Sequence, residues 1–149
     1  MVYGGGKQGL MGVVADAALE GGAEVLGIMT RQLIDREIAH DGLTELVVVE
    51  NMTERKRMMA EQADAFLTLP GGVGTMEEFF ETLTAGYLSL HDGPIGLLNL
   101  GNFYGPLMEF LSLTVERGLA KPRLLDVLKV HDEPEPLLDV VLGPRARNI

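Results

Sequence analysis

Short apolar runs alternate along the chain with longer segments in which apolar residues recur every three to four positions. The short runs, bounded by turn residues, predict buried strands, and the longer spaced pattern predicts amphipathic helices. Strands are predicted at 2–3, 24–29, 46–49, 65–69, 95–98 and 127–131. Helices are predicted at 10–20, 53–63, 75–88, 104–117 and 133–142, with a loop and a short helical turn over 30–40.

Strands that alternate with helices are typical of a parallel sheet with helices on both faces. No internal repeat or linker interrupts the pattern, so we predict a single α/β domain over 1–149 with a Rossmann-like, doubly wound sheet. In such folds ligands bind at the carboxyl ends of the strands, where the strand order reverses. Two glycine clusters directly follow predicted strands, and this places the candidate site beside them.

Charge and composition narrow the class of partner. The formal net charge is -10, from 22 acidic and 12 basic residues, whereas nucleic-acid binding normally starts from a basic face. We therefore expect no nucleic-acid partner, although backbone amides and one or two cations can still hold a small phosphate. No apolar run reaches the roughly 18 residues of a membrane span, and no signal-peptide pattern is visible.

The sequence shows no cysteine or histidine pattern of a metal site. The chain has no cysteine, so neither a disulfide nor a thiolate metal site can form. His40, His91 and His131 are scattered and show no ligand spacing. We therefore predict no metal site. Because the sequence shows neither a membrane span nor a signal-peptide pattern, we also predict no membrane association and a cytoplasmic location.

The second glycine cluster carries the stronger chemical signal. Pro70-Gly71-Gly72-Val73-Gly74 joins the predicted strand at 65–69 to the predicted helix at Thr75. Glycine lets the backbone approach a ligand closely, and the free amides of a helix N-terminus favour a phosphate. The alternative is a tight turn in which Thr75-Met76-Glu77-Glu78 forms a plain capping box. Three glycines exceed what a turn needs, and this favours phosphate binding.

The first glycine cluster matches a dinucleotide fingerprint only in part. Gly4, Gly6 and Gly9 fit G-x-G-x-x-G, but a lone match is a weak signal. The acidic residue expected about 20 positions further on would be Glu24. Glu24 starts a predicted strand instead of ending one, so NAD binding is the lesser alternative.

Two basic residues stand where helix chemistry disfavours them. Arg55 and Lys56 fall in the first turn of the helix that Thr53 is predicted to cap, where cations oppose the helix dipole. Their position beside a strand's carboxyl end favours a functional role, and two solvated side chains are the alternative. Glu37, within Asp35-Arg36-Glu37-Ile38, is a further candidate for which a surface ion pair is the simpler explanation.

Taken together, two segments carry a resemblance to a known family. The chain resembles the LOG (Lonely Guy) family of cytokinin-activating phosphoribohydrolases, whose bacterial members are often labelled possible lysine decarboxylases. The family pairs an RK dipeptide with PGGxGTxxE, and Arg55-Lys56 and Pro70–Glu78 match every fixed position. The segments Gly4–Gly12 and His91–Asn99 are similar to the family's glycine-rich start and its HDKPVGLLN stretch. Family members usually begin with one more strand and helix, which we expect this chain to lack.

The resemblance implies hydrolysis of the N-glycosidic bond of adenosine 5′-monophosphate or of an N6-substituted form of it, without a cofactor. The products are the free base, a cytokinin or adenine, and ribose 5-phosphate. Arg55 and Glu78 match the catalytic pair. The resemblance further implies a homodimer. The matching substrate-binding positions are Glu37, Lys56, Gly72, Val73, Gly74, Thr75, Met76, Glu77 and Thr84.

Two other functions compete for the same residues. A pyridoxal-phosphate decarboxylase needs a Schiff-base lysine and a cofactor phosphate site, and none of the four lysines, at positions 7, 56, 121 and 129, lies in such a setting. We therefore reject the decarboxylase label. The alternative that stays open is a non-catalytic, Rossmann-type protein that binds or carries a nucleotide or cofactor without turnover.

Overall fold

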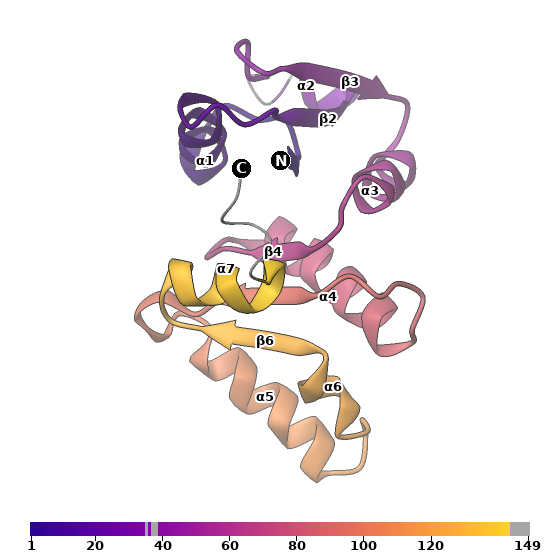
Figure 1. Ribbon diagram of the computed structural model, residues 1–149. Helices are drawn as coiled ribbons and strands as arrows, with labels where there is room; N and C mark the ends of the chain where they lie inside the picture. The colour runs from indigo at the N-terminus through magenta and orange to yellow at the C-terminus, as the bar shows by residue number, and fades with distance from the viewer. Residues whose placement is uncertain (35, 37–38, 144–149) are drawn as a thin grey trace. The chain divides into compact units, whose positions relative to one another are not determined.

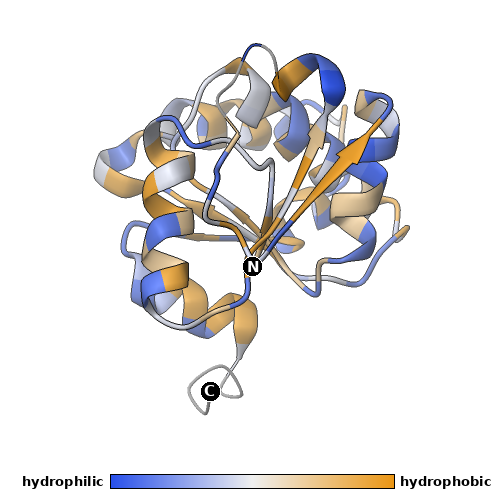
Figure 2. Cartoon of the chain, turned by 90° about the horizontal axis from the view of Figure 1, so that it is seen from above, coloured by the Kyte–Doolittle hydropathy of each residue, from blue (hydrophilic) through white to orange (hydrophobic). Residues whose placement is uncertain are grey.

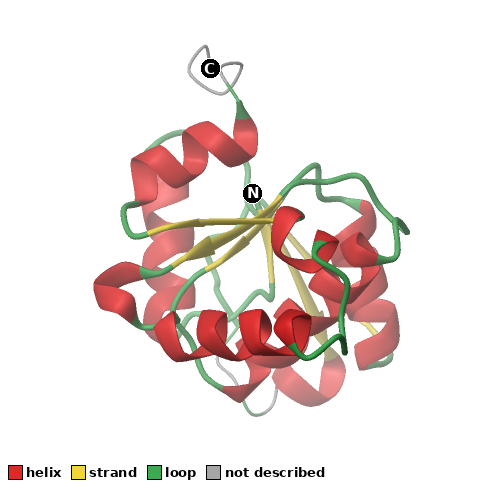
Figure 3. Ribbon diagram, turned by 90° about the horizontal axis from the view of Figure 1, so that it is seen from below, coloured by secondary structure: helices red, strands yellow, loops and turns green. Residues whose placement is uncertain are grey.

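The computed structural model describes residues 1–34, 36 and 39–143. They form two compact units, Met1–Ala63 and Asp64–Ile149. Each unit has a three-stranded parallel sheet whose strands are joined by helices (Figures 1 and 3). The predicted α/β class with parallel strands is thereby confirmed. Among the described residues, no helix is long and apolar enough to cross a membrane.

The first unit is built on the strand order β1-β2-β3. Tyr3 at the end of β1 pairs with Gly27, and Thr30 at the end of β2 pairs with Val49. The strands carry mostly hydrophobic residues, as Figure 2 shows by colour. The elements are β1 (Val2–Tyr3), α1 (Gly9–Glu20), β2 (Leu26–Thr30), α2 (Arg31–Ile34), β3 (Glu45–Val49) and α3 (Met52–Glu61).

The second unit has the strand order β4-β5-β6. Its elements are β4 (Phe66–Thr68), α4 (Val73–Tyr87), β5 (Ile95–Leu98), the 3-10 turn η1 (Leu100–Asn102), α5 (Gly105–Glu116), α6 (Arg123–Asp126), β6 (Leu128–His131) and α7 (Pro134–Leu142). The short helix α6 was not predicted from the sequence.

The central strand β5 is buried on both faces, which explains its unbroken apolar sequence. Ile95 and Leu97 face a core that also contains residues of α4 and α5. Leu98 packs on the opposite face against Leu137 and other residues of α7. A Cβ on Gly96 would lie 2.7 Å from Val141 of α7, so the close approach of α7 requires glycine there.

The helix α4 begins two residues earlier than the sequence predicted, and α1 and α3 each begin one residue earlier. The helix α4 starts at Val73 with Gly72 as its N-cap, and Gly72 makes no side-chain cap. Thr75 is thus the third helical residue, and the capping-box alternative for Thr75–Glu78 is wrong. The reason is the extended Gly72 (φ −91°, ψ −156°), from which the chain enters the helix at once.

The helix α3 is capped by Asn51, not by Thr53 as predicted. The Asn51 side chain accepts a hydrogen bond from the Glu54 backbone N–H at 2.9 Å. Arg55 therefore lies in the second turn, so the predicted conflict with the helix dipole in the first turn is also wrong. In the segment predicted as a loop with a helical turn, α2 covers 31–34, whereas Glu37 lies outside the described residues.

Candidate active site

Arg55 lies at the carboxyl edge of the sheet in the first unit. The helix α3 follows β3 after two residues, so its first turns stand at the strand ends. The Arg55 side chain is buried, with 7% of the residue exposed. Its Nε donates to the Ile28 carbonyl at 2.8 Å, and its Nη2 donates to the Gly4 carbonyl at 3.3 Å. The alternative of a solvated Arg55 is therefore wrong.

The sheet leaves room for this guanidinium because β1 is short. Its last residue, Tyr3, pairs with Gly27, so the Ile28 carbonyl lies just beyond the β1 pairing and is bound by Arg55 instead. A Cβ on Gly4 would overlap the Arg55 guanidinium. The first glycine of the G-x-G-x-x-G match thus has an explanation inside the unit: it makes room for Arg55.

The glycine loop that follows β1 is fixed by residues around His40. The His40 backbone N–H donates to the Gly5 carbonyl at 2.9 Å. The buried His40 ring accepts from the Gly42 N–H at its Nδ1 (3.1 Å). Its Nε2 then donates to Asp16 at 2.9 Å. No group of three metal-ligating side chains occurs among residues 1–34, 36 and 39–143.

Two further contacts hold the glycine loop that follows β1. Lys7 Nζ lies 2.6 Å from the Asp41 carboxylate, and this exposed pair raises the pKa of Lys7 and lowers that of Asp41. The Tyr3 hydroxyl donates to the Gly6 carbonyl at 3.1 Å. Burial, and secondarily the charge of Asp16, raises the pKa of Tyr3 to about 12. The loop carrying Gly4 is therefore held from several sides.

The second part of the candidate site is the turn into α4. Gly72, Val73 and Gly74 are exposed, with Val73 at 89%. A Cβ on Gly72 or Gly74 would meet no atom within 4 Å, whereas one on Gly71 would overlap the Thr75 side chain. The fold therefore explains Gly71 but leaves open why residues 72 and 74 are glycine. Gly72 serves as the N-cap of α4, and close approach of a ligand to the two glycines stays a prediction.

The other predicted residues are divided between the units. Half-buried Lys56 follows Arg55 on α3, whereas half-buried Thr75, Met76 and Glu78 and exposed Glu77 lie in the first two turns of α4. Thr84 is exposed, further along α4. Arg55 and Glu78 thus belong to different units, and their meeting in one site stays a prediction.

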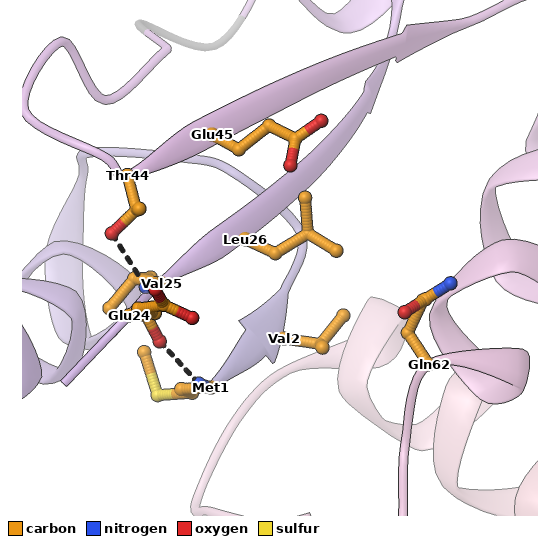
Figure 4. Close-up of a pocket in the computed structure, with 8 residues that line it drawn as sticks. All are labelled: Met1, Val2, Glu24, Val25, Leu26, Thr44, Glu45 and Gln62. Carbon is orange, nitrogen blue, oxygen red and sulfur yellow. Dashed lines mark hydrogen bonds between the residues drawn. The ribbon is translucent and has the colours of Figure 1, made fainter.

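A pocket in the first unit lies at the opposite edge of its sheet (Figure 4). Val2, Leu26 and Glu45 line it at the starts of the three strands. Its volume is about 260 Å³, and Arg55 does not line it. In parallel sheets of this class, ligands bind at the carboxyl ends, so the pocket is not the predicted site.

Comparison with known proteins decides the family. Residues 11–141 match the family described as "Possible lysine decarboxylase". A cytokinin riboside 5′-monophosphate phosphoribohydrolase of Rhodococcoides fascians is 49% identical over 145 residues, covering 97% of this chain and 73% of the relative. The chain belongs to the LOG family. The resemblance inferred from the RK and PGGxGTxxE segments is thereby confirmed.

Plant members of the LOG family match over less of their own length. A probable cytokinin riboside 5′-monophosphate phosphoribohydrolase of Oryza sativa subsp. japonica is 41% identical over 93% of this chain and 57% of the relative. A cytokinin riboside 5′-monophosphate phosphoribohydrolase of Arabidopsis thaliana is 42% identical over 86% of this chain and 60% of the relative. This LOG-family chain thus spans about three-fifths of these plant relatives.

Replacing Gly74 with alanine separates the structural need for glycine from the functional one. Alanine is the better helix former, and its Cβ meets open space, so we expect a gain of about 0.5 kcal/mol in the free energy of unfolding. If a phosphate approaches Gly74 closely, the same methyl group weakens the binding of AMP several-fold. Thermal unfolding and calorimetric titration with AMP measure the two effects. A stabilised variant with unchanged AMP binding would contradict the close approach.

Proposed function

We propose that this LOG-family chain hydrolyses the N-glycosidic bond of AMP or an N6-substituted AMP, releasing the base and ribose 5-phosphate. The observation that carries the proposal is the buried Arg55, held against Gly4 and Ile28 at the sheet's carboxyl edge. It belongs to the same RK and PGGxGTxxE pattern as the exposed glycine turn. The names of its relatives, which are phosphoribohydrolases of cytokinin riboside 5′-monophosphates, support the same reaction.

The proposed chemistry follows from charge development on the ribose. When the bond to the base breaks, the ring becomes oxocarbenium-like and positive, as in glycoside hydrolysis. The Glu78 carboxylate stabilises that charge or orients the attacking water. Water adds to the anomeric carbon, and the departing base takes up a proton.

Arg55 acts through its positive charge and planar shape, not by proton transfer, because a guanidinium stays protonated at any working pH. Its planar fork fixes the substrate or stabilises negative charge on the departing base. In this scheme, the amides from Gly72 to Thr75 hold the 5′-phosphate at the start of α4. The energy of binding the phosphate, which lies away from the bond that breaks, positions the ribose for reaction. In the same scheme, Glu37, Lys56 and Thr84 are further substrate contacts.

Product analysis tests the proposal directly. The purified protein is incubated with AMP and with isopentenyladenosine monophosphate, and free base is measured by chromatography. We expect base release from at least one of them. Tight nucleotide binding without base release would favour the alternative of a non-catalytic carrier.

We also propose that the chain forms a homodimer and acts in the cytoplasm as one domain over 1–149. The support for a dimer is apolar surface on and beside α5, where Phe103 and Phe110 are 54% and 56% exposed. Exposed aromatic side chains are enriched at protein–protein interfaces.

Sedimentation tests the proposed dimer. The expected mass is twice the 16.1 kDa of one chain, and Phe110→Glu should yield monomers because it places a charge in the apolar contact. Glu109→Gln on the same helix serves as the control. A monomeric wild-type chain would contradict the dimer.

A further inference from the structure

Tyr104 is a buried tyrosine whose hydroxyl lies at the glycine turn of the second unit. It is 3% exposed and packs in the core formed by α4, α5, β5 and β6. Its hydroxyl donates to the Leu69 carbonyl at 2.7 Å. Burial raises the pKa of this hydroxyl, and the nearby Gly71 backbone opposes the rise. The Tyr104 side chain is therefore hydrogen-bonded to the backbone directly before Pro70.

The backbone around Pro70 requires such a partner. Proline has no N–H and interrupts the hydrogen bonding of a strand, and β4 ends at Thr68. The Leu69 carbonyl lies beyond the end of β4, on a half-buried residue, and its partner comes from outside the ladder. The Tyr104 hydroxyl is the partner of the Leu69 carbonyl, because a phenol O–H can donate to it.

Tyr104 is itself held at a fixed position by the loop after β5. Its backbone N–H donates to the Asn99 side chain at 2.6 Å. The Asn99 side chain also donates to that of Asn102 at 3.3 Å. Gly101 and Asn102 both have left-handed φ values, of +58° and +62°, and this compact loop ends at Tyr104. The hydroxyl thus extends from a braced loop to the turn that precedes α4.

We propose that Tyr104 is a positioning residue that sets the Leu69–Gly72 turn so that the first amides of α4 converge on the 5′-phosphate. Phosphate binding by converging amides depends on the direction of each N–H. Without the hydroxyl, Gly71 and Gly72 have a wide choice of conformations because they lack side chains. Tyr104 removes that freedom without contacting the substrate. This inference rests on the proposed function of the turn as a phosphate site.

The test compares Tyr104→Phe with Tyr87→Phe. The first change keeps the ring in the core and removes only the hydroxyl contacts at the turn. The second also removes a hydroxyl, at the other end of α4, that accepts a hydrogen bond from the Lys121 N–H at 3.2 Å. The dissociation constants of ribose 5-phosphate and of adenine are measured for both variants by calorimetry, together with kcat and KM for AMP.

We expect Tyr104→Phe to weaken ribose 5-phosphate about tenfold and to raise the KM for AMP similarly. Adenine binding and kcat should change little, and Tyr87→Phe should behave like the wild type. Unchanged ribose 5-phosphate binding in Tyr104→Phe, with or without a loss of thermal stability, would overturn the positioning role. Equal weakening of adenine and ribose 5-phosphate would overturn it too, because the loss would not be specific to the phosphate.

A second variant provides the same test if Tyr104→Phe does not fold. Asn99→Ala removes the acceptor of the Tyr104 N–H outside the core, and we expect the same selective loss of ribose 5-phosphate binding. A wild-type chain that binds ribose 5-phosphate but releases no base would refute the proposed reaction, and the binding comparison would still decide the role of Tyr104. A wild-type chain that does not bind ribose 5-phosphate would overturn the inference.

Discussion

Glu78→Gln is expected to lower the rate of base release from AMP by about 1000-fold and to leave nucleotide binding nearly unchanged. The amide keeps the size of the carboxylate but carries no charge. It can neither stabilise a positive ribose ring nor accept a proton from water. The effect should therefore appear in kcat, whereas KM for AMP and the unfolding temperature should stay close to the wild-type values.

Glu81→Gln is the matched control for this prediction. Glu81 lies on the same helix, is exposed and is outside the proposed site. It should retain wild-type kinetics, which would show that the loss in Glu78→Gln does not come from a weaker charge on α4. Retention of more than a tenth of the wild-type kcat in Glu78→Gln would remove Glu78 from the proposed catalytic pair.

Gly4→Ala is expected to lower kcat/KM for AMP by about 100-fold, because misplacing a catalytic group by an ångström has effects of that size. The added methyl group would overlap the Arg55 guanidinium. Gly4 is not among the glycines with a positive φ, so the backbone itself accepts alanine. The clash is with the end of a flexible side chain, and the guanidinium moves away from the Gly4 carbonyl.

Gly4→Ala tests the catalytic role of Arg55 more cleanly than Arg55→Ala does. Arg55→Ala also leaves the carbonyls of Ile28 and Gly4 without their side-chain donor. That loss is expected to destabilise the first unit by about 1–3 kcal/mol and mixes a folding effect with a catalytic one. Both variants should lose activity, but Gly4→Ala should retain most of its stability.

Gly21→Ala provides the control for the added methyl group. Gly21 has a φ of −74°, and a Cβ there would lie 3.4 Å from the Ala17 carbonyl oxygen, which is an ordinary contact. It should leave activity and stability unchanged. Full activity in Gly4→Ala would show that the reaction does not depend on the observed position of the Arg55 guanidinium.

The site could be predicted from sequence where local pattern and chemistry agree. Glycines at 71, 72 and 74 before a helix predicted a strand-to-helix turn, and the turn is present. The start of that helix was misplaced by two residues because Thr75 and Glu78 fit a capping box. Gly72 caps the helix without a side chain, and no sequence signal distinguishes the two arrangements.

Contacts between distant segments could not be predicted in this way. Arg55 was identified by its position after a strand, but its burial depends on a carbonyl 27 residues away in β2. Tyr104 was not singled out at all, because its hydroxyl reaches Leu69 across 35 residues. A buried hydroxyl always needs a partner, yet the sequence does not show which tyrosine is buried or what it contacts.

The sequence by itself determined the α/β class, the two glycine clusters after strands and the family, because these depend on local periodicity and on motifs read in order. Only the tertiary structure decided what the glycines are for. Gly4 makes room for a guanidinium, Gly71 for Thr75 and Gly96 for α7, whereas Gly74 faces open space. The physical reason is that the need for glycine depends on the atoms that a side chain would meet at that position. Folding brings most of those atoms from elsewhere in the chain.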